Sequence, residues 1–201
     1  MKIICIGRNY ADHAKELNNA VPEKPVWFMK PDTSLLKDNA PFYYPDFTSD
    51  LHYECELVLR ISKAGKHIQE EFATGYFDQI SLGIDFTARD VQEEKKKKGL
   101  PWEEAKAFDG SAIIGKMVPA ADFPFPLQFS LEKNGVPVQQ GHTNDMLFSP
   151  AKVIAYVSTF VTLKVGDLIY TGTPAGVGPV SIGDTLTGKL GDLILFQTEI
   201  K

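Results

Sequence analysis

The chain has 201 residues, of which 43% are hydrophobic and 23% are charged. These values are ordinary for a globular protein and argue against disorder, a collagen helix or a coiled coil. Asp and Glu outnumber Lys and Arg by 26 to 21, so the net charge is −5, which disfavours binding to nucleic acid through its phosphates. The same acidity disfavours small anionic substrates. The length suits one domain, over residues 1–201.

Cysteine usage and hydropathy bear on the compartment. Cys5 and Cys55 lie in apolar surroundings without the spacing of a zinc site, so we expect buried free thiols in a reducing compartment. No apolar segment approaches the ~20 residues of a membrane-spanning helix, and the first apolar run is too short for a signal peptide. The sequence therefore predicts a cytoplasmic protein that does not bind membranes.

The predicted elements begin with a short buried strand at residues 3–6 and a helix at about 10–19. Asn9 is the expected N-cap of this helix, with Asp12 as the acid of a capping box. Five prolines within residues 20–50 predict loops and short strands there.

Later elements follow from alternation, turn residues and prolines. They are a strand at 51–61, a helix at 86–98, a hairpin of strands 127–133 and 136–140, and a helix at 151–160. Gly99 ends the second helix, Asn134-Gly135 makes the hairpin turn and Pro150 begins the last helix. Three Gly-Asp turns in the last 40 residues suggest a β-meander or roll. The expected fold is mixed α+β but mostly β, with three short helices.

The strand at 51–61 carries two acids, Glu54 and Glu56, whose side chains project from the same face. They lie roughly 6–7 Å apart along the strand, so they repel unless water, protons or a cation compensate. A hard divalent ion uses carboxylate oxygens in this way, whereas the simpler interpretation is the polar face of a half-exposed strand. Asp85, just before the helix at 86–98, is either a helix cap or a third acid of the same site.

Basic residues follow these acids in the chain. Arg89, which shares a helix face with Gln92, suits recognition of a substrate carboxylate. Lys106 lies between aromatic and small residues. It is either aimed at an anion or a carbonyl group, or it covers Trp102 or Phe108 with its aliphatic stem.

Three further segments allow a functional or a structural interpretation. His13 and Glu16 are spaced i, i+3 and can hydrogen-bond, either as a general base oriented by a carboxylate or as a surface pair. Thr173 lies in a Gly-rich turn at 171–179, which either offers N–H groups and a hydroxyl to a carboxylate or is only a turn. The four lysines at 95–98 are flanked by glutamates and predict a solvated helix face.

Six short motifs follow one another along the chain. They are Gly7-Arg8-Asn9-Tyr10 with His13 and Glu16; Phe28-Met29-Lys30-Pro31; His52 with Glu54 and Glu56; Asp85 with Thr87-Ala88-Arg89-Asp90 and Gln92; Trp102 with Lys106 and Phe108-Asp109; and Thr171-Gly172-Thr173-Pro174 with Gly176-Val177-Gly178. In this order they resemble the fumarylacetoacetate hydrolase (FAH) family, over residues 4 to about 186. The chain is most similar to the short, single-domain members that act as acylpyruvate hydrolases and oxaloacetate decarboxylases.

The resemblance implies a β-roll with short peripheral helices, assembled as a homodimer, with a lid at about residues 8–25 that orders when ligand binds. It implies Mg²⁺ or Mn²⁺ as the cofactor. The implied site residues are Glu54, Glu56 and Asp85 for the metal; His13, Glu16 and Lys106 for catalysis; and Arg89, Gln92 and Thr173 for the substrate.

The implied activity is hydrolysis of a C–C bond in 2,4-diketo acids (acylpyruvates) through a metal-stabilised pyruvate enolate. Oxaloacetate decarboxylation, keto–enol tautomerisation and isomerisation of a 2-hydroxydienoate, of the 2-hydroxyhepta-2,4-diene-1,7-dioate type, remain alternatives because they use the same enolate. The alternative outside enzymes is a metal-dependent keto-acid-binding protein, which would not need both His13 and Glu16. The expected partner is a small 2-keto acid.

Overall fold

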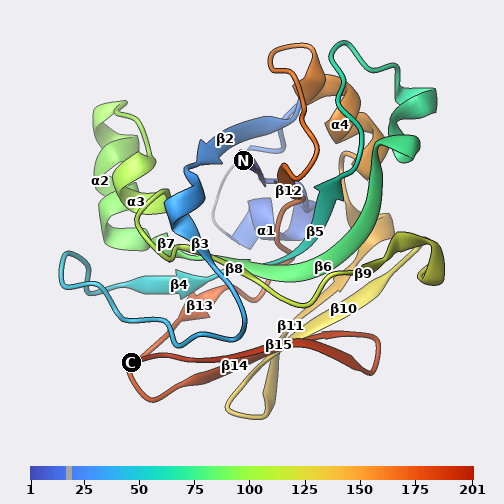
Figure 1. Cartoon of the computed structure of the whole chain (residues 1–201). Coiled ribbons are helices and arrows are strands. Elements are labelled where there is room, and N and C mark those ends of the chain that lie inside the picture. Colours follow the sequence, from blue (N-terminus) through green and yellow to red (C-terminus); the bar gives the residue numbers. More distant parts are fainter. Residues whose placement is uncertain (17–19) are drawn as a thin grey trace.

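Figure 1 shows the computed structural model of the chain, which describes residues 1–16 and 20–201. Its largest layer is an eight-stranded sheet. The strands are, in spatial order, β2 (Val26–Lys30), β1 (Ile3–Gly7), β12 (Leu168–Tyr170), β5 (Cys55–Ile61), β6 (Phe77–Asp85), β8 (Ala112–Ile114) and β3 (Leu35–Leu36), with β9 (Val118–Pro119) also paired to β6. The long β6 curves across the molecule, so the sheet is curled (Figure 1).

Two smaller sheets accompany the large one. Four antiparallel strands lie below it in Figure 1: β11 (Val136–His142), β10 (Gln128–Lys133), β14 (Thr185–Leu190) and β15 (Leu193–Glu199). The third sheet consists of β13 (Gly178–Pro179), β4 (Leu51–Tyr53) and β7 (Thr87–Ala88).

The helices are short and lie around the sheets (Figure 1). The α-helices are α1 (Ala11–Glu16), α2 (Arg89–Lys98), α3 (Glu103–Lys106) and α4 (Pro150–Ser158). The 3₁₀ helices are η1 (Asp32–Ser34), η2 (Glu70–Tyr76), η3 (Ala120–Asp122) and η4 (Thr143–Asp145). Among the described residues, none of these helices is both long and apolar enough to cross a membrane.

The main hydrophobic core fills the space between the large sheet and the four-stranded sheet. Leu57 and Leu82 of the large sheet belong to the same buried cluster as Leu131 and Phe196 of the other sheet. Because side chains alternate along a strand, Val58 points to the opposite face and joins a second, smaller cluster there. The two faces of β5 are therefore both buried, and the polar residues on this strand must find partners inside the protein.

Much of the predicted fold is confirmed. The chain is mostly β, and both cysteines are buried free thiols. Asn134 and Gly135 form the hairpin turn with φ values of 56° and 78°, and Gly99 ends α2 in a left-handed conformation. Pro150 is in the first turn of α4.

Two predicted elements have wrong boundaries, and one helix was not predicted. The strand expected at 51–61 is interrupted at Glu54, because β4 pairs within the three-stranded sheet while β5 pairs within the large one. The helix expected at 86–98 begins at Arg89, because the two residues before it form β7 and pair with β4. The four-residue helix α3 was not among the three helices expected.

The predicted cap of the first helix is also wrong. The Asn9 amide donates to the carbonyl groups of Phe148 and Thr171 and accepts from the Phe148 N–H, so it joins distant loops instead of capping α1. Asp12 accepts from the Lys15 ammonium. The end of the helix expected at 10–19 and part of the lid expected at 8–25 lie outside the described residues.

Gly83 lets three segments pack closely at the centre of the large sheet. A Cβ atom at this position would lie 2.4 Å from the Ile113 carbonyl oxygen and 2.7 Å from Cε1 of Tyr170. We predict that Gly83→Ala lowers the free energy of unfolding by about 1–3 kcal/mol, as overpacked cores do. Urea denaturation measures this. Gly75→Ala is the control, since Gly75 is exposed with nothing within 4 Å of its added Cβ. Equal effects of the two variants would contradict the packing account.

Candidate functional site

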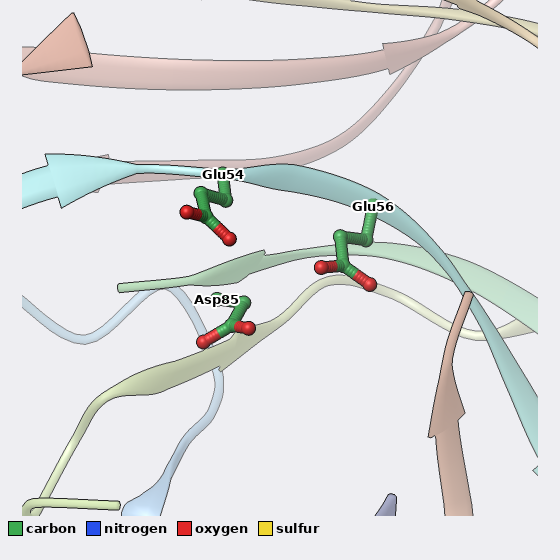
Figure 2. Close-up of side chains that lie close together, drawn as sticks. All are labelled: Glu54, Glu56 and Asp85. Carbon is green, nitrogen blue, oxygen red and sulfur yellow. The ribbon is translucent and has the colours of Figure 1, made fainter. Parts of the chain in front are cut away.

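Three acidic side chains lie close together where β6 ends beside the start of β5 (Figure 2). Glu54 follows β4, Glu56 lies in β5 and Asp85 ends β6. Their carboxylate oxygens can lie within 4.8 Å of one another, and the residues are only 6%, 2% and 1% exposed. In the antiparallel register Cys55 is opposite Ile84, which puts Glu54 opposite Asp85 on the same face. The half-exposed strand face and the helix cap, the two structural interpretations, are therefore wrong.

Three buried cations compensate two of these acids. Nη2 of Arg89 lies 2.7 Å from Oε1 of Glu54, and Nζ of Lys106 lies 2.8 Å from its Oε2 and 2.9 Å from Oδ2 of Asp85. Nζ of Lys30 lies 2.6 Å from Oδ1 of Asp85. The ammonium group of Lys106 therefore lies within the acidic cluster, as the functional interpretation expected, and 5.4 Å from the centre of the Phe28 ring.

Lys30 is a site residue that the sequence analysis did not assign. Its side chain is fully buried, and its ammonium also donates to the carbonyl oxygen of Ser111, at 2.8 Å. The available signal was a lysine at the end of an apolar run, in the motif Phe28-Met29-Lys30-Pro31. A lysine in such a position needs an anionic partner if it is buried. The sequence does not reveal that this partner is Asp85.

The surrounding charges shift the pKa values of Glu54 and Glu56 in opposite directions. Burial alone would raise the pKa of Glu54, but Lys106 and Arg89 outweigh it and hold that pKa well below its ordinary value. Burial and the neighbouring Asp85 hold the pKa of Glu56 well above its ordinary value. Burial would lower the pKa of the Lys106 ammonium, yet the charges of Asp85 and Glu54 raise it above its ordinary value.

Unused acceptor capacity remains in this cluster. Glu56 accepts a hydrogen bond from the Gly172 N–H at 2.6 Å, and none of the described cations lies within 4 Å of it. Oδ1 of Asp85 is buried and accepts no hydrogen bond among the described residues, because the nearby Lys30 ammonium is poorly directed for one. Carboxylate oxygens of this kind are the ligands that hard divalent ions prefer. The residues present thus fit a divalent metal ion.

His13 and Glu16 form the predicted hydrogen-bonded pair. Nδ1 of His13 lies 3.2 Å from Oε2 of Glu16, and the Gly176 N–H donates to Oε1 of Glu16 at 3.1 Å. His13 is 5% exposed, so the surface-pair interpretation is wrong for the imidazole. A buried imidazole with a carboxylate on one nitrogen can accept a proton on the other.

One cavity brings the predicted site residues together. Eight of the nine predicted residues line this cavity, and the ninth, Glu16, is hydrogen-bonded to His13. The eight are His13, Glu54, Glu56, Asp85, Arg89, Gln92, Lys106 and Thr173. Nη1 of Arg89 donates to Oε1 of Gln92 at 2.8 Å, and Nε of Arg89 is buried without a hydrogen-bond partner in the described part of the chain. That N–H group is an unused donor of a residue that lines the cavity.

Gln139 of β11 is a second residue that the sequence analysis missed. Its Oε1 accepts from the Cys55 N–H at 2.9 Å, and its Nε2 donates to Oγ1 of Thr173 at 2.8 Å and to the Pro174 carbonyl at 2.9 Å. Because the Thr173 oxygen accepts this bond, its own hydrogen is free to be donated into the cavity. No local pattern indicated this role, since the partners are 34 to 84 positions away.

Comparison with known proteins agrees with this geometry. The sequence profile described as fumarylacetoacetate (FAA) hydrolase, C-terminal, matches residues 2–199. The chain belongs to the fumarylacetoacetate hydrolase family. It is 43% identical over 201 residues to oxaloacetate tautomerase FAHD1, mitochondrial, of Mus musculus, a match that covers 99% of this chain and 91% of that protein. It is 44% identical over 189 residues to oxaloacetate tautomerase YcgM of Escherichia coli (strain K12), covering 92% and 86%.

A solved structure extends the likeness to three dimensions. The crystal structure of fumarylpyruvate hydrolase from Pseudomonas aeruginosa, in complex with Mn²⁺ and pyruvate, matches the chain with a TM-score of 0.93 and 35% identity. The match covers 100% of this chain and 89% of that one. The predicted family and its mostly β fold are thus confirmed, and this member of the family is an enzyme by its relationship to these proteins.

The role of Gln139 can be tested by its effect on stability. We predict that Gln139→Leu lowers the free energy of unfolding by about 2–3 kcal/mol, because buried hydrogen-bonding groups on β5 and on the Thr173 turn lose their partner. Gln140→Leu, at the exposed neighbouring position, should stay within about 0.5 kcal/mol of the parent protein. Guanidinium denaturation of both variants makes the comparison. An unchanged stability of Gln139→Leu would contradict the linking role.

Proposed function

We propose that this enzyme catalyses the keto–enol tautomerisation of oxaloacetate with the help of a divalent metal ion. The observation that carries the proposal is the single cavity in which three buried acids meet a histidine held by a glutamate. The two oxaloacetate tautomerases at 43% and 44% identity support the choice of substrate. Tautomerisation was an alternative in the sequence analysis, which favoured hydrolysis of acylpyruvates.

Glu54, Glu56 and Asp85 would hold the metal ion, either Mg²⁺ or Mn²⁺. The oxygen-only donor set supports this assignment, as does the Mn²⁺ in the fumarylpyruvate hydrolase structure. When bound, a divalent ion stabilises negative charge that develops on a coordinated substrate oxygen. The three neighbouring basic side chains offset the charge of the three acids. A divalent ion would therefore leave the site with a surplus of two positive charges, which suits a dicarboxylate.

His13 would move the proton. When its Nδ1–H is donated to Glu16, the neutral imidazole has Nε2 free to accept a proton from C3 of the keto form. The imidazolium would then return a proton to the C2 oxygen, which gives the enol, and the reverse steps give the keto form. Glu16 would stabilise the imidazolium, and the Gly176 N–H keeps that carboxylate in position.

Other residues would bind the carboxylate next to the keto group. The buried Nε–H of Arg89 and the Thr173 hydroxyl hydrogen are donors not used by other described residues. Gln92 would fix the orientation of the Arg89 guanidinium through their hydrogen bond. Lys106, which is paired with Glu54 and Asp85, would donate to the substrate's oxygen once a metal takes over those acids.

Entry of the substrate would require the lid. The cavity has a free volume of only about 40 Å³, which suits an ion or a water molecule better than a four-carbon acid. His13 lies on α1, within the expected lid, so movement of this helix would open the cavity. Opening and closing of this lid would therefore be part of the catalytic cycle.

Hydrolysis of acylpyruvates is the second candidate, and the same His13–Glu16 pair favours it, since an oriented imidazole can also activate water. Oxaloacetate decarboxylation and dienoate isomerisation would use the same enolate. The buried pair argues against a protein that only binds keto acids, because binding does not need a base.

The cellular setting and the assembly are proposals of the same kind. Two buried free thiols support a reducing compartment, and we propose the cytoplasm. We propose a homodimer from the family resemblance, which sedimentation equilibrium would test.

A variant of His13 tests the catalytic proposal. We predict that His13→Gln lowers kcat/KM for oxaloacetate tautomerisation by about 10²–10⁴-fold, the usual contribution of a general base. The decay of enol absorbance in a stopped-flow instrument measures the rate. His67→Asn is the control, because His67 is exposed and its positive φ suits Asn. A wild-type rate for His13→Gln would exclude His13 as the base.

A variant of Glu56 tests the metal proposal separately from activity. We predict that Glu56→Gln weakens Mn²⁺ binding at least about tenfold, because it removes one of three charged ligands. Titration calorimetry measures the affinity. The same variant should leave the stability of the metal-free protein unchanged or higher, because Gln carries no charge and can still accept from the Gly172 N–H. Glu71→Gln, at an exposed position, is the control. Unchanged Mn²⁺ affinity would contradict the proposed ligand set.

A further inference from the structure

The cavity also has basic residues that the proposed chemistry does not use. Arg8 and Lys96 line it together with the metal-site acids. In contrast to Arg89 and Lys106, neither has an acidic side chain within 4 Å among the described residues. Both are less buried than the three acids, so they lie toward the solvent side of the cavity.

The four lysines at 95–98 are not equivalent. Lys95 pairs with Glu104 and Lys98 pairs with Glu94, each at 2.6 Å, and Lys97 is exposed. Lys96 alone of the four lines the cavity, with its ammonium 5.7 Å from the centre of the Trp102 ring. The solvated helix face predicted from the sequence is confirmed for Lys96, Lys97 and Lys98, which are exposed, whereas Lys95 is half-buried.

Lys96 lies in a locally cationic environment. Partial burial lowers the pKa of its ammonium, and the charges of Arg89 and Arg8 lower it further and outweigh the opposing charge of Glu54. Cations that repel one another across a cavity gain free energy when an anion lies between them. The inner cations are already paired with Glu54 and Asp85, so such an anion would be held by Arg8 and Lys96.

The backbone at Arg8 supports a functional role. Its φ is 59°, in the left-handed region that side chains other than Gly, Asn and Asp rarely adopt. The next residue, Asn9, holds this turn through its amide bonds to Phe148 and Thr171. Strain of this kind is retained where the surrounding structure enforces it, often at binding sites.

We propose that Arg8 and Lys96 form an anion subsite that binds the distal carboxylate of the substrate, so that the enzyme selects dicarboxylic keto acids over monocarboxylic ones. The inference rests on the proposed function and extends it to the substrate's second charged group. It also gives a physical reason to prefer oxaloacetate to acylpyruvates with an uncharged acyl group.

Equilibrium binding tests the subsite without relying on turnover. The two probes are oxaloacetate and 2-oxobutanoate, in which a methyl group replaces the distal carboxylate. Quenching of tryptophan fluorescence in the presence of Mn²⁺ reports binding, since Trp102 lines the cavity. We expect the parent protein to bind oxaloacetate more tightly. Lys96→Met should weaken oxaloacetate binding about five- to tenfold, as loss of one partly exposed charge pair does, and leave 2-oxobutanoate unchanged.

The matched variants separate a local subsite from a general charge effect. Lys97→Met removes the same charge from the exposed neighbour and should change neither affinity, whereas Lys96→Arg should retain most of the preference. Arg8→Asn, which tolerates the positive φ, should reproduce the loss seen with Lys96→Met.

Two results would overturn the subsite: equal weakening of both probes by Lys96→Met, or no preference for oxaloacetate in the parent protein. A protein that prefers oxaloacetate but does not accelerate its tautomerisation would contradict the proposed function and leave the subsite supported.

Discussion

The burial of three carboxylates within 4.8 Å of one another is the constraint on which the rest of this structure depends. Removing a carboxylate from water is costly unless charges or hydrogen-bond donors replace the solvent, and three together repel. The protein offsets this cost with two lysines and an arginine and with the Gly172 N–H. These contacts satisfy Glu54 and part of Asp85, but Glu56 keeps a raised pKa. A divalent ion would complete the compensation of these charges. The uncompensated acidity of Glu56 and the proposed metal-dependent function would then have the same cause, the burial of three carboxylates close together.

The fold satisfies this constraint by bringing together segments from most of the chain. Glu54 lies at the break between β4 and β5, whereas Glu56 in β5 and Asp85 in β6 belong to the large sheet, and all three acids face one cavity. Gly172 packs where a Cβ would lie 2.6 Å from that of Asn9, so the loop bearing the N–H donor to Glu56 is held against the start of the lid. The same loop receives Glu16 at Gly176. The metal-site acids and the His13–Glu16 pair are thus joined through one rigid turn.

The features that could be predicted from the sequence are those that depend on a local pattern or on the order of motifs along the chain. Alternation put Glu54 and Glu56 on one face, the spacing of His13 and Glu16 made them a pair, and motif order indicated the family. The sequence could not show that Lys30 faces Asp85 or that Gln139 joins Cys55 to Thr173, because these contacts link residues that are far apart in the chain. Element boundaries failed for a related reason: β7 and the break at Glu54 exist only because distant strands pair there. The prediction from composition was misleading as well. The net negative charge disfavoured an anionic substrate, but three of the acidic residues belong to the proposed metal site, which would suit an anionic substrate.

The most direct test of the central claim is an anomalous difference map from a crystal grown with Mn²⁺. The account predicts a Mn²⁺ peak coordinated jointly by Glu54, Glu56 and Asp85, with the Lys106 ammonium displaced from its position between two of these acids. A map with no peak there, in which Lys106 still bridges Glu54 and Asp85 while Mn²⁺ is bound elsewhere, would contradict it. In that case the acidic cluster would be a buried ion-pair network of purely structural importance.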